Sequence, residues 1–342
     1  MLQLKSKLKI SWSYSICILV AAVLLLQVAC TRDPQSKTPH DRKLRVIAIF
    51  ATPIEEPWDK AIHDALLKAQ LNLSIDYKWT DNVSQNEFEK TLRQYAEERN
   101  DLIVGDAFAS EEIVRRVARD YPGIAFCFGS GLGPVAPNFS VFDNWIHEPA
   151  YLAGLIAGKL TKSNIIGIVG GFPIPEVNRI ANAFILGAKE ANPNVKFKVA
   201  FIGSWFDPPK AKNATHVILS QGADVIYAER AGVIEACDEA KIPVIGNLTD
   251  QSRASEMVVT SVVWDMWPTV NHVIELVRSG KFTAENYAEW SMMSKGGARL
   301  AQFAAWERRL NKNIIDMVNK RADEIITGRF RVPIDEFEPK SQ

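Results

Sequence analysis

Short, almost wholly apolar runs alternate with helix-patterned segments from Leu44 onward, and this alternation limits the fold more than any other feature. Residues 44–51 (LRVIAIFA) and 165–170 (IIGIVG) have the composition of buried strands. Between such runs, residues 58–69 carry apolar side chains at helical spacing. Strands and helices in this alternation form parallel sheets covered by helices on both faces. The sequence therefore predicts an α/β fold with doubly wound parallel sheets.

The alternation starts again after Ile146, which predicts two successive α/β units of similar size. We expect a first lobe made of residues 44–143 and 266–285 and a second lobe made of residues 144–265 and 286–335. Extended runs at residues 141–143 and 260–264 are predicted to cross between them. Two lobes joined by such crossings describe a hinged clamp.

The first 29 residues have the pattern of an export signal. Three lysines within residues 5–9 precede an apolar stretch at residues 16–29, which is shorter than the roughly twenty residues that a membrane span needs. Small residues before Cys30 resemble a bacterial lipobox, although Gln27 departs from the usual leucine, so Cys30 is the predicted lipidation site. The alternative is an uncleaved anchor helix. Either way, the mature chain is expected outside the cytoplasmic membrane, held at the cell membrane.

The remaining composition narrows the class of protein. Residues 30–43 are polar and predict a flexible tether. The chain after residue 29 has a net charge of about −3, which is not the clustered basic surface that nucleic acid needs. Cys127 and Cys237 are expected as buried apolar residues rather than a disulfide.

Several side chains at predicted strand ends are candidates for ligand binding, because open α/β sheets bind small ligands outside the carboxyl ends of their strands. The candidates are Trp58, Phe108, Glu176, Trp205, Asp207 and Glu229. Trp58 and Trp205 fall at equivalent strand ends in the two lobes. Each could stack on a flat heterocycle, worth about 1–3 kcal/mol by analogy with bases, or pack in its own lobe.

The three acidic candidates each have a second interpretation. Glu176 could accept hydrogen bonds from the N–H groups of a purine edge, or sit at a helix start because a carboxylate is favourable there. Asp207 precedes two prolines, and the pattern favours a helix N-cap over a ligand contact. Glu229 could enter the cleft or form an ion pair at the surface.

Motifs for catalysis and cofactors are missing from the sequence. There is no phosphate-binding GKS or GKT loop, no metal spacing among the five histidines and no Gly-x-Ser-x-Gly elbow. Gly129, Gly131 and Gly133 are spaced like part of a dinucleotide fingerprint, but prolines follow where a helix should begin. We therefore expect no cofactor, no metal and no enzymatic activity.

Several motifs together resemble the basic membrane protein family of substrate-binding lipoproteins, which serve ABC importers and have the type I periplasmic-binding fold. The motifs are YLAGLIAGKLTKSNIIGIVGG, PIPEVNRIANAFILGAKEANPN, GSWFDPPKA, GADVIY and TSVVWDM. The run after the first strand is similar to the purine-binding branch. That resemblance implies that Trp58 and Trp205 sandwich the base and that Glu176 contacts its polar edge. The chain departs from the branch at residues 228–231 (AERA), where QHxDS is usual and Glu229 could replace the acid.

The resemblance implies a lipid-anchored, extracytoplasmic receptor that captures a purine base or nucleoside and delivers it to an ABC permease and its ATPase. Other branches of the family bind riboflavin, so a different heterocycle is one alternative. A sensory receptor is a second, since the fold also serves signalling. An enzyme that processes nucleosides, with Asp106 or Glu176 as acid or base, is a third.

Overall fold

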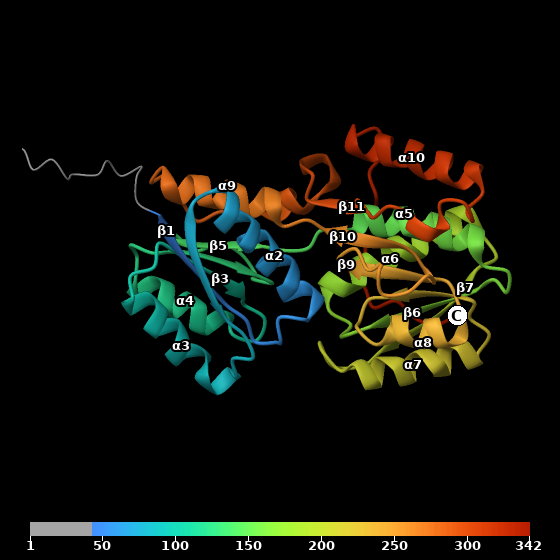
Figure 1. The fold of residues 1–342 in the computed structure, drawn as a ribbon, viewed down its shortest axis with the longest axis horizontal. Helices are drawn as coiled ribbons and strands as arrows, with labels where there is room; N and C mark the ends of the chain where they lie inside the picture. Colours follow the sequence, from blue (N-terminus) through green and yellow to red (C-terminus); the bar gives the residue numbers. More distant parts are fainter. Residues whose placement is uncertain (1–42) are drawn as a thin grey trace, which may run out of the picture. The chain divides into compact units, whose positions relative to one another are not determined.

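A computed structural model describes residues 43–342. The expected signal segment (residues 1–29), the lipidation site Cys30 and the tether up to residue 42 lie outside the described residues. Two separate sheets organise the described part of the chain, and each is mainly parallel (Figure 1). We call each sheet together with the helices that cover it a lobe.

The sheet of the first lobe has the strand order β2-β1-β3-β4-β5, with every neighbouring pair parallel. Its strands are β1 (Leu44–Ile49), β2 (Ile75–Thr80), β3 (Leu102–Asp106), β4 (Ala125–Gly129) and β5 (Phe139–Phe142). This is a doubly wound order, in which the connections run in opposite directions on either side of the β1/β3 boundary. The reversal leaves a crevice at the carboxyl ends of β1 and β3.

The second sheet repeats that order and adds one antiparallel edge strand: β11-β10-β9-β8-β6-β7. Its strands are β6 (Ile165–Gly170), β7 (Lys196–Phe201), β8 (Val225–Ala228), β9 (Val244–Leu248), β10 (Val258–Trp264) and β11 (Ala298–Leu300). The corresponding reversal lies between β6 and β8. The architectural repeat that the sequence predicts is therefore confirmed, with two equivalent crevices.

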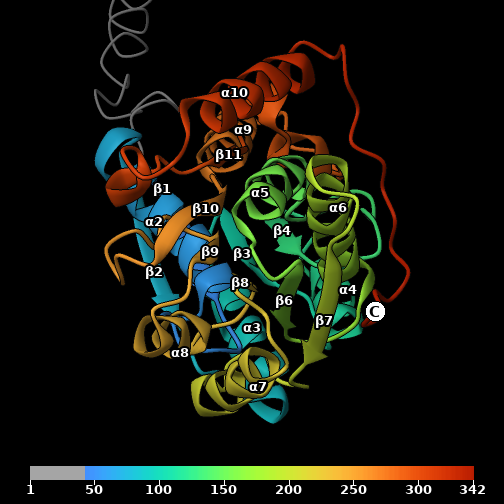
Figure 2. The same ribbon diagram turned by 90° about the vertical axis from the view of Figure 1, so that its right-hand side faces the viewer.

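Helices cover both faces of each sheet, as the near-continuous apolar strands require. In the first lobe α2 (Pro57–Asn72) and α9 (Trp267–Arg278) pack on one face, and α3 (Gln85–Glu97) and α4 (Glu111–Asp120) on the other. In the second lobe α5 (His147–Leu160) and α6 (Pro175–Ala191) lie opposite α7 (Pro208–Ser220) and α8 (Val233–Ala240) (Figure 2). The C-terminal helix α10 (Lys312–Ile326) packs on α5.

Three segments pass from one lobe to the other. The first follows β5 at Asp143, and the second follows β10 at Asp265. The third leaves residues 285–287, whose backbone pairs with Val141 of β5, and continues to β11. The crossings are predicted at residues 141–143 and 260–264, but residues 141–142 end β5 and residues 260–264 end β10, so the passage between the lobes begins one residue after each strand. The residue boundaries expected for the two lobes stay a prediction.

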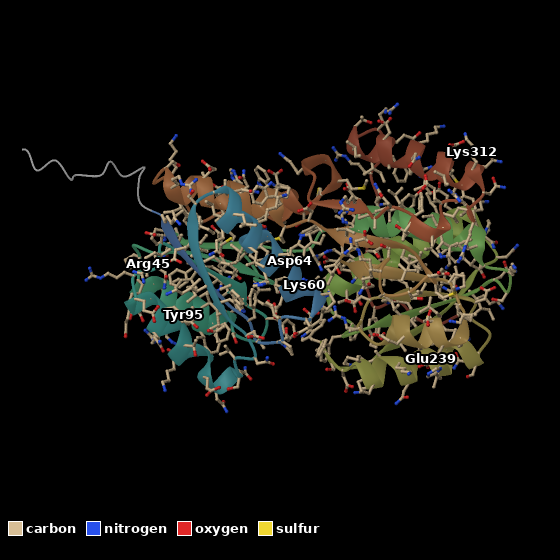
Figure 3. The ribbon with its side chains drawn as sticks, in the orientation of Figure 1. Arg45, Lys60, Asp64, Tyr95, Glu239 and Lys312 are labelled. Atoms are coloured by element: carbon tan, nitrogen blue, oxygen red, sulfur yellow. The ribbon has the colours of Figure 1, made fainter. Side chains whose placement is uncertain are left out.

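The end of the chain lies along the second lobe beside α6 and β7 (Figure 2). Arg179 of α6 donates to Asp143 Oδ2 at 2.5 Å and to Glu336 Oε1 at 3.3 Å, so one side chain ties the first crossing to this C-terminal segment. Ion pairs on the surface include the one between Lys60 and Asp64 of α2, whose Nζ and Oδ2 atoms lie 2.9 Å apart (Figure 3).

Cys127 and Cys237 are buried and free, as expected. In residues 43–342, no helix combines the length and hydropathy that crossing a bilayer requires.

Candidate ligand-binding site

The carboxyl ends of strands from both sheets surround one cavity with about 390 Å³ of space between protein atoms, part of it open to solvent. From the first lobe it is lined by what we call the first wall: Thr52, Glu56, Trp58, Asp59, Asp106, Phe108 and Ser130. From the second lobe it is lined by the second wall: Glu176, Trp205 and Arg230. All ten residues follow or end β1, β3, β4, β6, β7 or β8. Both sheet reversals therefore open on the same space.

Trp58 belongs to the first wall and is also part of the core. Its side chain is only 7% exposed, and its indole stacks on Phe142 at 5.9 Å with 17° between the ring planes. A second indole, from Trp264 at the end of β10, lies 5.1 Å away. A Cβ at Gly129 would approach Trp58 Cη2 to 2.0 Å, so only glycine leaves room for this ring. The close approach of the Trp58 ring thus explains why residue 129 is a glycine, without any dinucleotide site.

Trp205 belongs to the second wall and lies on the loop between β7 and α7, where it is half-buried. Trp58 follows β1, but β7 corresponds to β2 of the first sheet, so the prediction that the two indoles follow equivalent strands is wrong. Phe172 contacts it from the same lobe at 4.8 Å, and Phe108 from the first lobe meets it edge-on at 5.1 Å. Its indole Nε1 is buried and has no hydrogen-bond partner among the described residues. Buried donors without partners are uncommon in folded proteins.

Carboxyl groups dominate the polar lining, and burial raises the pKa of each. Burial raises the pKa of Asp106 to about 7, and the nearby Glu56 and Asp143 add to the effect. The pKa of Asp59 is raised well above its ordinary value by burial and by the charges of Glu56 and Asp106. Burial and Asp143 similarly raise the pKa of Glu176. Carboxyl oxygens accept hydrogen bonds in either protonation state, so such a lining suits a ligand that presents hydrogen-bond donors.

Glu176 begins α6 at its second residue, where the helix dipole favours an acidic side chain. Its carboxylate makes no hydrogen bond or salt bridge to any residue in the described part of the chain, yet it lines the cavity. By contrast, Asp59 accepts from the Thr52 hydroxyl, and Asp106 accepts from the Phe108 amide at 2.9 Å. Glu176 is thus the lining carboxylate whose acceptor capacity remains unused.

Arg230 sits between carboxylates of the two lobes. Its Nη2 lies 2.5 Å from Glu229 Oε1, and its Nη1 lies 3.1 Å from Glu56 Oε1. Burial opposes ionisation of Arg230, but the two carboxylates outweigh it and keep its pKa above the ordinary value. Its guanidinium also lies 5.2 Å from the centre of the Trp205 ring.

The structure brings four of the six predicted binding residues together: Trp58, Phe108, Glu176 and Trp205 all line the cavity. Phe108 is 37% exposed, at the edge of the first wall. The other two lie nearby but outside the lining. Glu229 is buried under Arg230 and accepts from the Gly171 amide at 2.8 Å. Asp207 caps α7 by accepting from the Lys210 amide at 3.0 Å.

Sequence reasoning missed several lining residues: Thr52, Glu56, Asp59, Ser130 and Arg230. The signal for them was the position of their segments, since each follows a parallel strand of one of the two reversals or of β4. Arg230 directly follows Glu229, and such a pair in sequence is typical of an ion pair at the surface. Its contact with Glu56 joins residues 174 positions apart, which no local pattern in one sequence could indicate.

Comparison with known proteins identifies relatives along most of the chain. A putative ABC transporter glucose-binding protein from Haloferax volcanii is 31% identical over 75% of this chain, which spans 65% of that relative's length. A purine-binding protein from Brucella abortus is 28% identical over 83% of this chain and 80% of its own length. Among solved structures, an ABC transporter solute-binding protein from Aeropyrum pernix superposes with a TM-score of 0.73 at 20% identity, covering 85% of this chain and 94% of the other.

The similarity to the Aeropyrum pernix structure confirms the expected fold class of two α/β lobes. At 20% identity this similarity concerns the fold alone. A family model for PnrA-like ABC transporter substrate-binding proteins matches residues 45–331, which is most of the chain. The family and the fold are those of extracytoplasmic solute-binding proteins. The chain belongs to the PnrA-like family of ABC transporter substrate-binding proteins.

Proposed function

We propose that this protein captures a purine base or nucleoside between its lobes and delivers it to an ABC permease driven by an ATPase. The observation that carries the proposal is the placement of Trp58 and Trp205, which come from different lobes and line one cavity. Two aromatic faces on opposite walls suit a flat ring. Glu176, with unused acceptor capacity, suits the N–H groups at the edge of that ring. The purine-binding protein of Brucella abortus is a relative over most of the chain.

The lining of the cavity offers two kinds of contact to a small aromatic ligand, namely indole faces and carboxyl oxygens. Two stacked faces at about 1–3 kcal/mol each and hydrogen bonds to carboxylate at about 1.5–3 kcal/mol are offset by ordering costs. Micromolar binding, about −8 kcal/mol, is within reach of these contributions.

We infer binding without turnover, because the lining carboxyls come with no nucleophile or metal motif in the sequence. The proposed location is the outer side of the cytoplasmic membrane, with a lipid on Cys30 as the anchor. Glycerol-linked fatty acids on that cysteine, detected by mass spectrometry of the intact protein from its host, would test the anchor. An unmodified Cys30 within an uncleaved N-terminus would contradict it.

The ligand is tested by titration calorimetry of the full chain with adenine, guanosine, riboflavin and glucose. We expect heat with adenine or guanosine and none with the other two. Glucose is included because the Haloferax volcanii relative is named as a putative glucose-binding protein. Binding of glucose or riboflavin alone, or of none of the four, would contradict the proposal.

Two controls sharpen this titration. Trp79→Ala removes an indole that is 44% exposed on β2 and does not line the cavity, so this variant should bind like the parent protein. Chromatography of the guanosine after titration should recover it intact. Free guanine in that sample would instead reveal a nucleoside-processing enzyme.

A further inference from the structure

We propose that Arg230 is a latch between the lobes: a positioning residue whose bond to Glu56 forms on closure and sets both binding walls in place. The inference goes beyond the proposed function and depends on it only for the consequence on ligand affinity. Arg230 follows β8 of the second lobe, and Glu56 precedes α2 of the first lobe. Their side chains meet at 3.1 Å at the cavity, and each is only 4% exposed.

The latch can be separated from the rest of the cluster by asking which contacts survive when the lobes move apart. Arg230 and Glu229 are adjacent in one lobe, so their ion pair at 2.5 Å does not depend on closure. Glu56 keeps its own role in the other lobe, where its Oε2 accepts from the amides of Trp58 and Asp59. Within this charged cluster, the contact that opening must break is the one between Arg230 Nη1 and Glu56 Oε1.

Burial makes the ion pair between Arg230 and Glu56 energetically important. In the closed arrangement Glu56 and Arg230 are shielded from water. Removing Arg230 leaves the Glu56 carboxylate without its cation, and removing Glu56 leaves Arg230 with the Glu229 carboxylate alone. Breaking a buried pair by removing one partner is strongly destabilising, whereas an exposed pair contributes little. Lobes that lack one partner can avoid that cost by opening, because water then solvates the remaining charge.

The same guanidinium positions both indoles. Arg230 Nη1 donates to the Trp205 carbonyl at 2.8 Å, and its guanidinium carbon lies 5.2 Å from the Trp205 ring centre. Arg230 is also bonded to Glu56, which caps α2. The Glu56 carboxylate in turn accepts from the Trp58 amide at 2.8 Å. A planar fork with several donors can serve these partners together, which a lysine ammonium on its flexible stem cannot do in the same way.

Hydrogen exchange of the ligand-free full chain, followed by mass spectrometry, tests the latch without any purine. The variants are Glu56→Gln, which keeps an oxygen for the helix cap, Arg230→Met, and the two combined. The reporting segments are residues 105–110 and 203–208, which meet across the lobes where Phe108 contacts Trp205. We expect exchange at least about tenfold faster in both segments for each single variant.

A matched control is the ion pair of Arg321 and Glu190, which lie 2.8 Å apart on α10 and α6 of the second lobe. Arg321→Met and Glu190→Gln should leave exchange in both reporting segments unchanged. In the double variant of the latch, the increase should be smaller than the product of the two single increases, because the pair acts as one contact. The latch would be overturned if the increases in exchange rate multiply fully in the double variant. It would also be overturned if they stay within one lobe or if the control variants show them too.

Ligand affinity gives a second readout that separates this inference from the proposed function. If a ligand binds only closed lobes, its apparent dissociation constant rises as the closed fraction falls. Adenine or guanosine should therefore bind at least about tenfold more weakly to Glu56→Gln than to the parent protein. A parent protein that binds neither ligand but shows the exchange pattern would overturn the purine proposal and leave the latch standing. Purine binding by the parent protein, with unchanged exchange in the latch variants, would overturn the latch and leave the purine proposal standing.

Discussion

The two walls of the cavity hold their indoles in different ways. Trp58 on the first wall is buried against Phe142 and Trp264, which belong to strands that lead into the crossings between the lobes. Trp205 on the second wall stands on a loop, and part of its packing comes from Phe108 of the opposite lobe. One indole is therefore part of the permanent core, and the other completes its surroundings when the lobes meet. On the first wall an indole of the cavity lining is therefore also a core residue, whereas on the second wall the indole belongs mainly to the lining.

The largest expected effect tests whether Trp58 is structural. Trp58→Ala should lower the free energy of unfolding by about 3–5 kcal/mol, because it leaves a large cavity among Phe142, Trp264 and the strands beneath. Trp205→Ala should cost clearly less, since that ring is half-buried. Urea denaturation of both variants measures the difference. Equal losses would mean that both indoles are equally part of the core, and the contrast between the walls would fail.

The next effect concerns pH and the first wall. Burial raises the pKa of Asp106 to about 7 from an ordinary value of 3.8, so the folded protein binds more protons than the unfolded chain between these values. The free energy of unfolding should therefore fall as pH rises from about 4 to about 7, by at most about 4 kcal/mol from this group. Asp106→Asn should remove that part of the decline and leave the Phe108 amide an acceptor.

Denaturation at several pH values between 4 and 8 measures this slope in parent and variant. Asp76→Asn on β2 is a suitable control, because its side chain is exposed and remote from the cavity lining. A slope that stays the same in Asp106→Asn would show that this carboxyl is ionised in the folded protein at neutral pH. The first wall would then carry more negative charge than its burial suggests.

A smaller effect is expected on ligand affinity from the second wall. Trp205→Ala should weaken purine binding by about 1–3 kcal/mol, which is roughly tenfold or more, because one stacking face is lost. Calorimetry with the ligand that binds the parent protein measures this change. Trp79→Ala, which removes an indole outside the cavity, should show none. An unchanged affinity in Trp205→Ala would place its ring in packing instead.

The fold was predictable because its signal is local and repeated. Apolar strand runs such as residues 44–51 and 165–170, each followed by a helix pattern, indicate a parallel sheet wherever they occur. Four binding candidates were also predictable, since the rule about strand ends needs only the position of a residue after its strand. The exact start of each crossing was not predictable, because the end of a buried strand such as β5 or β10 and an extended connection have the same local pattern.

The missed part of the site depends on contacts between distant segments. In the sequence, Glu56 is one of two adjacent acids before a helix pattern, and Arg230 is a neighbour of Glu229; neither position indicates the other. Their pairing requires both sheet reversals to face each other, which the strand pattern of each lobe does not specify. The burial of Arg230 and its contact with Glu56 follow from that arrangement rather than from composition.

The smallest expected effect compares the two carboxylates that cap helices beside the indoles. Glu56 caps α2 within a buried cluster shared with Arg230, whereas Asp207 caps α7 with one bond to the Lys210 amide and lines no part of the cavity. Asp207→Ala should therefore lower the free energy of unfolding by about 1 kcal/mol, the usual contribution of an N-cap, and leave purine affinity unchanged. Urea denaturation and calorimetry on the same preparation measure both quantities. Weaker binding with unchanged stability would instead assign Asp207 to the ligand, as the sequence allowed, and would extend the second wall to the start of α7.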